Sequence, residues 1–228
     1  MLRRLVQLYL GIALYGASMA LMIRAGLGLD PWDVFHQGVA DHLGFAFGVV
    51  TMLTGVAVLL LWIPLRQLPG LGTVSNVVGV GLSVDAVLDV LPTPHALVVR
   101  IPLLAAGIVL NALATGAYIG ARFGPGPRDG LMTGLCARTG WSVRLVRTCI
   151  EVTVLISGIV LGGSFGVGTV AYALAIGPLV QFFLPRLSVA PRVRPEGGGA
   201  AAAPGADVPA ADAPAAEVPP AEAPAVAA

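Results

Sequence analysis

The chain has 228 residues, of which 57% are hydrophobic and only 11% are charged, and its formal net charge is +1. About a quarter of the residues of an ordinary soluble domain are charged, so this composition excludes that class and indicates a membrane protein. The small net charge says little about partners.

Six apolar stretches are long enough to cross a bilayer, which takes about 20 residues. We expect membrane spans at Leu5–Ile23, Phe47–Leu65, Thr73–Leu91, Leu97–Ile119, Val143–Leu161 and Val167–Leu184. The first stretch has features of a signal peptide, namely two arginines before an apolar core and a small-residue site at 17–20. We nevertheless expect it to be retained, because an internal span repeats its sequence pattern.

The first span is followed by "GLGLDPWDVFH" (26–36), in which glycine, proline and aspartate interrupt the apolar pattern. Asp30 is a suitable N-cap, Pro31 fits the first position of a helix, and Asp33 meets its positive end. These residues predict a short helix over Pro31–Leu43. Its thirteen residues reach only about 20 Å, so we do not expect the helix to span the hydrocarbon core.

The chain also contains an internal repeat with an offset of 96 residues. Leu8–Leu91 aligns without a gap on Leu104–Leu187, and roughly 25 of the 84 aligned pairs are identical. We therefore divide a membrane domain, 1–188, into repeat 1 (about 5–91) and repeat 2 (about 97–187).

The glycine–proline break occurs in both copies. In the second copy, "GPRD" places Gly126 as the cap, followed by Pro127 and Asp129. This predicts a second short helix over Pro127–Thr139. Whether the two short helices are re-entrant, interfacial or spanning is left open by the sequence.

Each repeat holds three spans, an odd number, so the second copy is expected to enter the membrane from the opposite side. With both termini in the cytoplasm of a bacterial cell, eleven arginines face inward and only Arg24 and Arg100 face outward. If the short helices also spanned, the count would be about nine to four. The positive-inside rule therefore favours six spans in two inverted repeats.

Residues at the starts of the short helices are the first candidates for binding a solute or ion: Asp33, Arg128 and Asp129. If the glycine turns dip into the protein, two positive helix ends approach the middle of the membrane from opposite sides and attract anions. Arg128 would then face a carboxylate or phosphate of the solute, while the aspartates orient polar groups or protons. The alternatives are that these residues only start a helix, or that Arg128 pairs with an aspartate. Trp32 replaces the arginine in repeat 1, which fits an asymmetric site or an interfacial tryptophan.

Three further candidates lie within the apolar stretches. Glu151 forms an ion pair with Arg147, one turn earlier, or couples a proton or cation, or contacts another partner that the sequence does not identify. Asp85 aligns with Gln181, so an inward or interhelical polar contact is expected at this depth in both copies. Other polar residues inside the spans are expected to bond between helices: Asn76, Asn111 and Tyr172.

The remaining polar positions give weaker indications. The first short helix is expected to have a wet face formed by His36, Gln37, Asp41 and His42. The motifs at 70–74 and 166–170 suggest loops whose threonine caps the next span. Because no metal-ligand pattern, nucleophile–base set or phosphate loop is found, we expect no metal, cofactor, enzymatic activity or nucleic-acid partner. The Ala/Pro-rich segment 189–228 is expected to be a disordered cytoplasmic tail.

Four segments together resemble the YczE/YyaS/YitT family of bacterial integral membrane proteins, and its YczE branch in particular. They are "RAGLGLDPWDVFHQGVA", "AYIGARFGPGPRDGLM", "RTGWSVRLVRTCIE" and "GVGTVAYALAIGPLVQFF". The resemblance covers nearly all of 5–187 but not the tail. It implies a multi-pass protein of the cytoplasmic membrane, and it implies no reaction and no site residues.

Inverted repeats, interrupted helices and duplicated helix starts favour a small-solute transporter or permease-like protein with its site between the repeats. The alternative is an accessory or scaffold protein that binds a protein partner or anionic lipid through the arginines of the central cytoplasmic loop. An intramembrane enzyme is a third interpretation, for which the sequence offers no catalytic set. The expected partners are the lipid bilayer and a small solute, and the sequence predicts neither the solute nor the oligomeric state.

Overall fold

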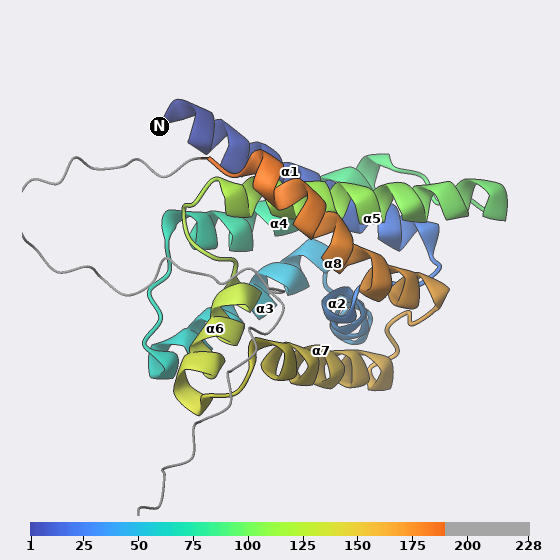
Figure 1. Ribbon diagram of the computed structural model, residues 1–228. Coiled ribbons are helices and arrows are strands. Elements are labelled where there is room, and N and C mark those ends of the chain that lie inside the picture. The colour runs from blue at the N-terminus through green and yellow to red at the C-terminus, as the bar shows by residue number, and fades with distance from the viewer. Residues whose placement is uncertain (190–228) are drawn as a thin grey trace, which may run out of the picture. The chain divides into compact units, whose positions relative to one another are not determined.

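The computed structural model describes residues 1–189, and all regular secondary structure in this range is helical (Figure 1). The helices are α1 (Leu2–Ala25), α2 (Pro31–Leu43), α3 (Phe47–Leu65), α4 (Leu71–Val90), α5 (Leu97–Gly120), α6 (Pro127–Thr139), α7 (Val143–Val160) and α8 (Val167–Leu187). The expectation of a disordered tail concerns 189–228, and all of this segment except Val189 lies outside the described residues. The Val189 N–H donates a hydrogen bond to the Gly120 carbonyl at 3.1 Å.

The two short helices begin and end where the sequence predicts. At the start of α2, the Asp30 side chain accepts hydrogen bonds from the N–H groups of Trp32 and Asp33, both at 2.9 Å. At the start of α6, Gly126 has no side chain that could cap the helix. Pro127 has no N–H, so the first turn of α6 has one fewer backbone donor that needs a partner. Both local sequences therefore fix a helix start directly after a glycine-containing turn.

Five of the long helices are long and apolar enough to cross a membrane: α1, α3, α4, α5 and α8. The helix predicted as a sixth span, α7, is not among them, and its 18 residues include Arg144, Arg147 and Glu151. The all-helical, multi-span fold class is thus confirmed, while the count of six spans is not settled by length and apolarity.

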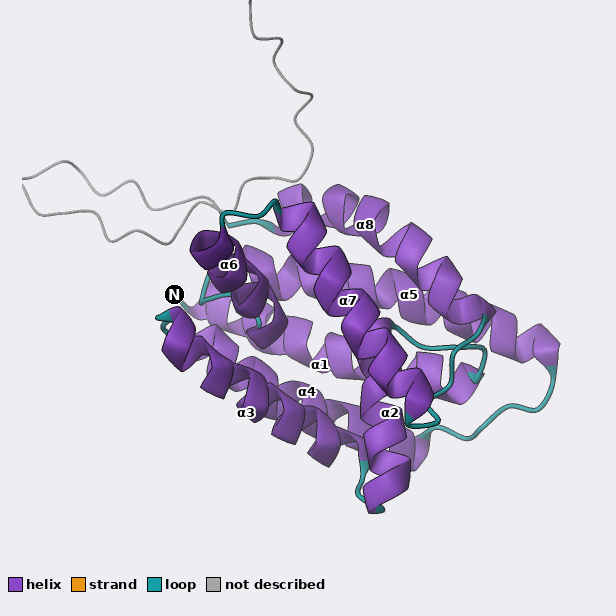
Figure 2. Cartoon of the chain, turned by 90° about the horizontal axis from the view of Figure 1, so that it is seen from below, coloured by secondary structure: helices purple, strands orange, loops and turns teal. Residues whose placement is uncertain are grey.

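The helices form two layers (Figures 1 and 2). In one layer, α4 packs on α1, α1 on α5, and α5 on α8. In the other layer, α2 packs on α7, α7 on α6, α6 on α3, and α3 on α2, which closes a ring. Each layer thus combines corresponding helices of both sequence repeats.

The centre of the first layer is the contact between α1 and α5, the first helices of the two repeats. A Cβ atom added to Gly11 would lie 2.8 Å from the Tyr118 nitrogen, and one added to Gly107 would lie 2.7 Å from the Met22 side chain. Near the other end of α1, Arg100 donates a hydrogen bond to the Ala25 carbonyl at 2.6 Å. The two helices therefore run antiparallel, and glycines allow their backbones to approach closely.

The turns before the short helices dock on the opposite repeat. The Leu27 carbonyl accepts a hydrogen bond from Gly168 N–H at 2.7 Å, and the Phe123 carbonyl accepts one from Gly72 N–H at 2.9 Å. The two contacts are equivalent, because the 96-residue offset relates Leu27 to Phe123 and Gly72 to Gly168. After each carbonyl comes a glycine with a φ of +116° or +118°, a conformation that residues with side chains rarely adopt.

This docking corrects one expectation. The helices α4 and α8 begin two residues before the expected threonine cap, because their first glycines are held by the opposite turn. Thr73 and Thr169 are the third residues of these helices, and each accepts a hydrogen bond from the N–H of the capping glycine, at 3.1 and 3.3 Å. Thr73 also donates to the Pro125 carbonyl at 2.7 Å, so it ties α4 to the turn before α6.

Candidate functional site

The starts of α2 and α6 lie side by side and bring together a charged cluster of Asp30, Asp33, Arg128 and Asp129. Asp30 and Asp33 are 1% and 0% exposed. From α6, an Arg128 terminal nitrogen lies 3.8 Å from Asp30 Oδ1, and the other lies 3.7 Å from Asp33 Oδ1. Of the alternatives for Arg128, the structure shows the ion pair with aspartate.

The indole ring of Trp32 forms one wall of the charged cluster. It is 8% exposed, and the Arg128 guanidinium lies over it at 4.8 Å from the ring centroid. Trp32 is therefore not exposed in the manner of an interfacial tryptophan but holds the guanidinium by a cation–π contact. The substitution of tryptophan for arginine between the repeats makes the cluster asymmetric.

Each buried aspartate uses only one of its oxygen atoms. Asp30 Oδ2 and Asp33 Oδ2 are buried and have no hydrogen-bond partner among the residues that the structure describes. Burial raises the pKa of both carboxyl groups above the usual aspartate range, and Arg128 opposes this rise. A buried carboxylate oxygen without a donor is costly, so these two atoms are where a proton or a donor from a ligand would stabilise the cluster most.

Asp129 is bound from the other layer. The Tyr118 hydroxyl of α5 donates a hydrogen bond to Asp129 Oδ2 at 2.8 Å, and the Tyr118 ring packs edge-on against Tyr15 of α1, with centroids 6.1 Å apart. Neither tyrosine stands out as a site residue in the sequence. Their partners lie on distant helices, and only the place of Tyr118 just before the glycine turn hinted at its role.

His36 corrects the expectation of a wet face on α2. It is 1% exposed, its Nδ1 lies 3.3 Å from Asp33 Oδ1, and the Thr51 hydroxyl of α3 approaches the same nitrogen at 3.4 Å. Asp41 is exposed as expected, because it lies near the free end of the helix. The helical spacing placed His36 on the same face as exposed residues but did not reveal that α3 covers the first turns.

A second polar set joins the helices of the first layer. Asn111 Nδ2 of α5 donates to the Ser18 hydroxyl of α1 at 3.0 Å, and the Tyr172 hydroxyl of α8 donates to Asn111 Oδ1 at 3.0 Å. The interhelical bonds expected for Asn111 and Tyr172 are confirmed. Tyr172 thus anchors the wall of the neighbouring pocket.

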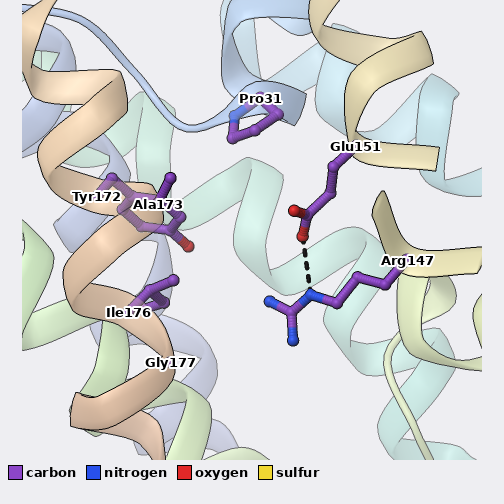
Figure 3. Close-up of a pocket in the computed structure, with 7 residues that line it drawn as sticks. All are labelled: Pro31, Arg147, Glu151, Tyr172, Ala173, Ile176 and Gly177. Atoms are coloured by element: carbon purple, nitrogen blue, oxygen red, sulfur yellow. Dashed lines mark hydrogen bonds and ion pairs between the residues drawn. The ribbon is translucent and has the colours of Figure 1, made fainter. Parts of the chain in front are cut away.

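A pocket with a volume of about 180 Å³ opens between α7 and α8 beside the start of α2 (Figure 3). On the α7 side, Arg147 Nε donates to Glu151 Oε1 at 3.0 Å, which confirms the predicted ion pair. The free end of the Arg147 guanidinium points into the open space. The lining residues are Pro31, Arg147, Glu151, Tyr172, Ala173, Ile176 and Gly177.

The corresponding region of repeat 1 is closed. A Cβ atom added to Gly81 of α4 would lie 2.6 Å from the Gly48 carbonyl oxygen of α3, so these helices touch through their backbones. Its repeat counterpart, Gly177 of α8, would meet nothing within 4 Å. The structure therefore holds α3 against α4 but leaves α7 apart from α8.

Asp85 and Gln181, the aligned polar pair, have different surroundings. Asp85 Oδ1 accepts a hydrogen bond from Gly48 N–H at 2.7 Å and thereby fastens α4 to the start of α3. Gln181 is exposed on α8. The expected interhelical contact exists in repeat 1 only, because its counterpart requires the closed arrangement that repeat 2 lacks.

Comparisons with known proteins show which family the chain belongs to. The model of a family of unknown function, DUF6198, matches residues 2–185. An uncharacterized protein of Haemophilus influenzae is 38% identical over 186 residues, which cover 82% of this chain and 85% of that protein. No solved structure matches the chain.

Two proteins of Bacillus subtilis are also similar. The uncharacterized membrane protein YczE is 32% identical over 176 residues, covering 77% of this chain and 81% of YczE. The uncharacterized protein YyaS is 26% identical over 180 residues, covering 77% of this chain and 90% of YyaS. These matches confirm the predicted likeness to YczE and YyaS. Together with the five apolar helices, they show that the chain is a membrane protein and belongs to the family of unknown function DUF6198.

Proposed function

We propose that the protein is a small-solute transporter of the bacterial cytoplasmic membrane, with its site between two inverted three-span repeats. The observation that carries this proposal is the charged cluster at the starts of α2 and α6, which lies beside a pocket with a further ion pair. Charges inside an apolar helical body are costly and mark ligand or ion pathways by default. The proposal includes no catalytic step and no cofactor.

The arrangement of the helices supports an inverted repeat. The first helices of the two repeats run antiparallel, and the two docked turns make equivalent contacts with the opposite repeat. The two short helices start beside each other, and each packs on the third helix of the other repeat. This is the geometry in which two interrupted helices present their ends to a shared site.

We count α7 as the sixth span. Its charged residues lie in its first three turns, and Arg147 and Glu151 face the pocket rather than lipid alone. An amphipathic span of this kind is stable in a bilayer when its polar side borders water. With α7 included, both termini lie in the cytoplasm and the excess of arginines is cytoplasmic.

The difference between the repeats suggests how a solute passes. In the structure, α3 and α4 are closed and α7 and α8 are apart, so the pocket beside the start of α2 lies on the α7–α8 side. On our proposal, a solute approaches the charged cluster from this pocket. If the repeats exchange their arrangements, α7 and α8 close on Gly177 while α3 and α4 separate at Gly81. The site is then exposed to the opposite side of the membrane, which is alternating access.

The scaffold alternative receives less support from the central arginines. Arg128 belongs to the charged cluster, Arg147 pairs with Glu151, and Arg138 donates to the Pro64 carbonyl of α3. Side chains that are engaged within the protein offer less to a docking partner or to lipid headgroups.

Uptake into liposomes tests the proposal. Purified protein is reconstituted, and the entry of labelled small carboxylates, inorganic phosphate and neutral solutes is measured. We expect at least one solute to enter faster than into protein-free liposomes, and Arg128→Gln to lower this rate about tenfold or more, because it removes one partner of a buried charge pair. Arg3→Gln, at the exposed start of α1, is the matched control and is expected to transport normally.

The protein level in the membrane and the gel-filtration profile in detergent must be unchanged for each variant. If no solute on the panel enters faster with the protein present, or if Arg128→Gln transports like Arg3→Gln, the proposed function is wrong.

A further inference from the structure

The two buried aspartates lie behind a single guanidinium group. Asp30 and Asp33 have side-chain exposures of 2% and 0%, whereas the Arg128 side chain is 28% exposed. Arg128 therefore stands between the carboxylates and the accessible space. Its nitrogen atoms lie 3.7 and 3.8 Å from the aspartate oxygens, beyond the length of a good hydrogen bond, so Arg128 offsets part of the negative charge of the pair without being tightly bound to it.

The groups that face this pair leave it short of positive charge. Arg128 of α6 is the one arginine within ion-pair distance of the aspartates among the described residues. Asp129, the next residue of α6, is a further acidic group, and Tyr15 lies close enough to interact electrostatically with all three aspartates. Tyr15 of α1 and Tyr172 of α8 are neutral groups near enough to interact electrostatically. His36 of α2 contacts Asp33 but is fully buried, which disfavours its charged form.

The positive ends of α2 and α6 supply only partial charges. When Arg128 moves away, two carboxylates three residues apart remain in a buried site. Two carboxylates at such short range cannot both stay ionised in a buried environment. The pair relieves the repulsion by taking up a proton.

We propose that Asp30 and Asp33 form a proton-binding site, in which one proton is taken up on an unpartnered Oδ2 atom when an anionic group draws Arg128 away from the pair. The proton comes from a hydronium ion of the surrounding water: one of its O–H bonds breaks as the carboxyl O–H bond forms, and a water molecule is left. No other bond of the protein changes. The role of the anionic group rests on the proposed transport function. It identifies the class of the transported solute as an anion that enters together with a proton. The proton site itself stands on the two buried aspartates and Arg128.

A metal cation fits the same place less well. Oxygen-binding metal ions take six or more ligands, and the pair offers two unpartnered carboxylate oxygens. A metal ion would also lie within a few ångströms of the Arg128 guanidinium, which repels it. A proton needs one oxygen atom and tolerates the neighbouring cation.

Trp32 provides a built-in reporter, because it touches Arg128 and lies close to both aspartates in the chain. The pH dependence of tryptophan fluorescence is measured on purified full-length protein in nanodiscs without any added solute. The part of the pH-dependent fluorescence change that is lost in Trp32→Phe comes from Trp32 and therefore reports on the charged cluster. Binding of the proton is also followed by the infrared carbonyl band of a protonated carboxylic acid.

We expect Arg128→Gln, which imitates the displaced guanidinium, to raise the midpoint of this transition by about one to three pH units. Asp30→Asn and Asp33→Asn each remove one of the two carboxylates. In either background, Arg128→Gln is expected to shift the midpoint clearly less, because the repulsion between the carboxylates is gone. The double aspartate variant is expected to lose the transition.

Two features keep these comparisons interpretable. Asparagine caps a helix as well as aspartate does, so Asp30→Asn keeps the start of α2. Asp41→Asn, at the exposed end of the same helix, is the matched control and leaves the midpoint unchanged.

Four outcomes overturn the proposal, of which the first three concern the variants. The midpoint is the same with and without Arg128→Gln, or the single aspartate variants retain the full shift, or the transition disappears in His36→Gln while the double aspartate variant keeps it, which assigns the proton to the imidazole. Exchange of potassium chloride for sodium chloride at constant ionic strength also has to leave the midpoint in place, because a sodium-dependent shift would assign the pair to a metal ion.

The titration distinguishes this proposal from the proposed function because it uses no transported solute. A titration as expected with no measurable uptake rejects the transporter and keeps the proton site. If a solute is taken up but the midpoint of the titration is unchanged in both aspartate variants, the proton site alone is rejected.

Discussion

At the scale of single residues, the fold depends on pairs in which a large side chain meets a glycine across the repeat boundary. Trp62 of α3 is 1% exposed, donates a hydrogen bond to the Pro127 carbonyl at 3.1 Å, and packs against Gly130 of α6. At the equivalent place in the other repeat, Gly158 of α7, the counterpart of Trp62, packs against the backbone of Val34 and Phe35 in α2. Each short helix is therefore held against the third helix of the other repeat by a close contact that a glycine permits.

The contact between Trp62 and Gly130 gives a stability prediction. A Cβ atom at position 130 would overlap the indole ring, so Gly130→Ala is expected to destabilise the protein by about 1 to 3 kcal/mol through overpacking. Trp62→Phe shortens the ring system and is expected to recover part of this loss in the double variant. The thermal unfolding midpoint in detergent measures both effects.

Gly177→Ala is the matched control, because it adds a methyl group to a helix where nothing lies within 4 Å. It is expected to leave the midpoint unchanged or slightly higher. Equal stability of Gly130→Ala and the wild type, or strictly additive effects of the two changes at 62 and 130, would contradict the packing described here.

Residues whose role is local were predictable, and residues whose role comes from another helix were not. Asp30 and the pair Arg147–Glu151 follow from spacing along one helix. Burial of His36 and the bond from Tyr118 to Asp129 depend on helices far away in the chain. The partner of Arg128 was also open in the sequence, because either a solute or an aspartate satisfies a guanidinium equally well.

At the scale of helices, the interrupted apolar pattern predicted both short helices to the residue, since proline and glycine act locally. Ends of the long helices were less well predicted. The start of α4 is Leu71 rather than Thr73, because a docked turn from the other repeat extends the helix. The sequence pattern of one helix does not indicate that a distant turn supplies a hydrogen bond. The spacing between α7 and α8 was likewise invisible in the sequence.

The glycines at 81 and 177 give a prediction for helix movement. Gly177→Leu is expected to fold normally, because its side chain enters the open pocket. It is expected to abolish solute uptake, because α7 and α8 can no longer close. Gly81→Leu, at the equivalent position of repeat 1, is expected to reduce folding, since even a Cβ atom there lies 2.5 Å from Met52.

Uptake into liposomes, together with the yield of monodisperse protein, measures this pair of variants. Wild-type uptake by Gly177→Leu would show that closure of α7 on α8 plays no part in transport.

At the scale of the whole molecule, the 96-residue repeat anticipates which helices correspond, and the equivalent contacts of the two docked turns agree with it. The two-layer arrangement was not predictable, because a hydropathy pattern does not state which apolar faces meet. Nor did the repeat predict that its copies differ, one closed and one open. That difference rests on residues such as Gly48, whose counterpart at 144 is arginine.

The most direct test of the account is the membrane side of two equivalent positions after the short helices. Phe45 and Trp141 are 96 residues apart and are 51% and 56% exposed. Each is replaced singly by cysteine in a background with Cys136→Ala and Cys149→Ser, and intact cells are treated with a membrane-impermeant maleimide. Inverted repeats predict that Phe45→Cys is labelled from outside and Trp141→Cys only after the membrane is opened. Labelling of both from the same side would contradict the inverted arrangement and, with it, the shared site between the repeats.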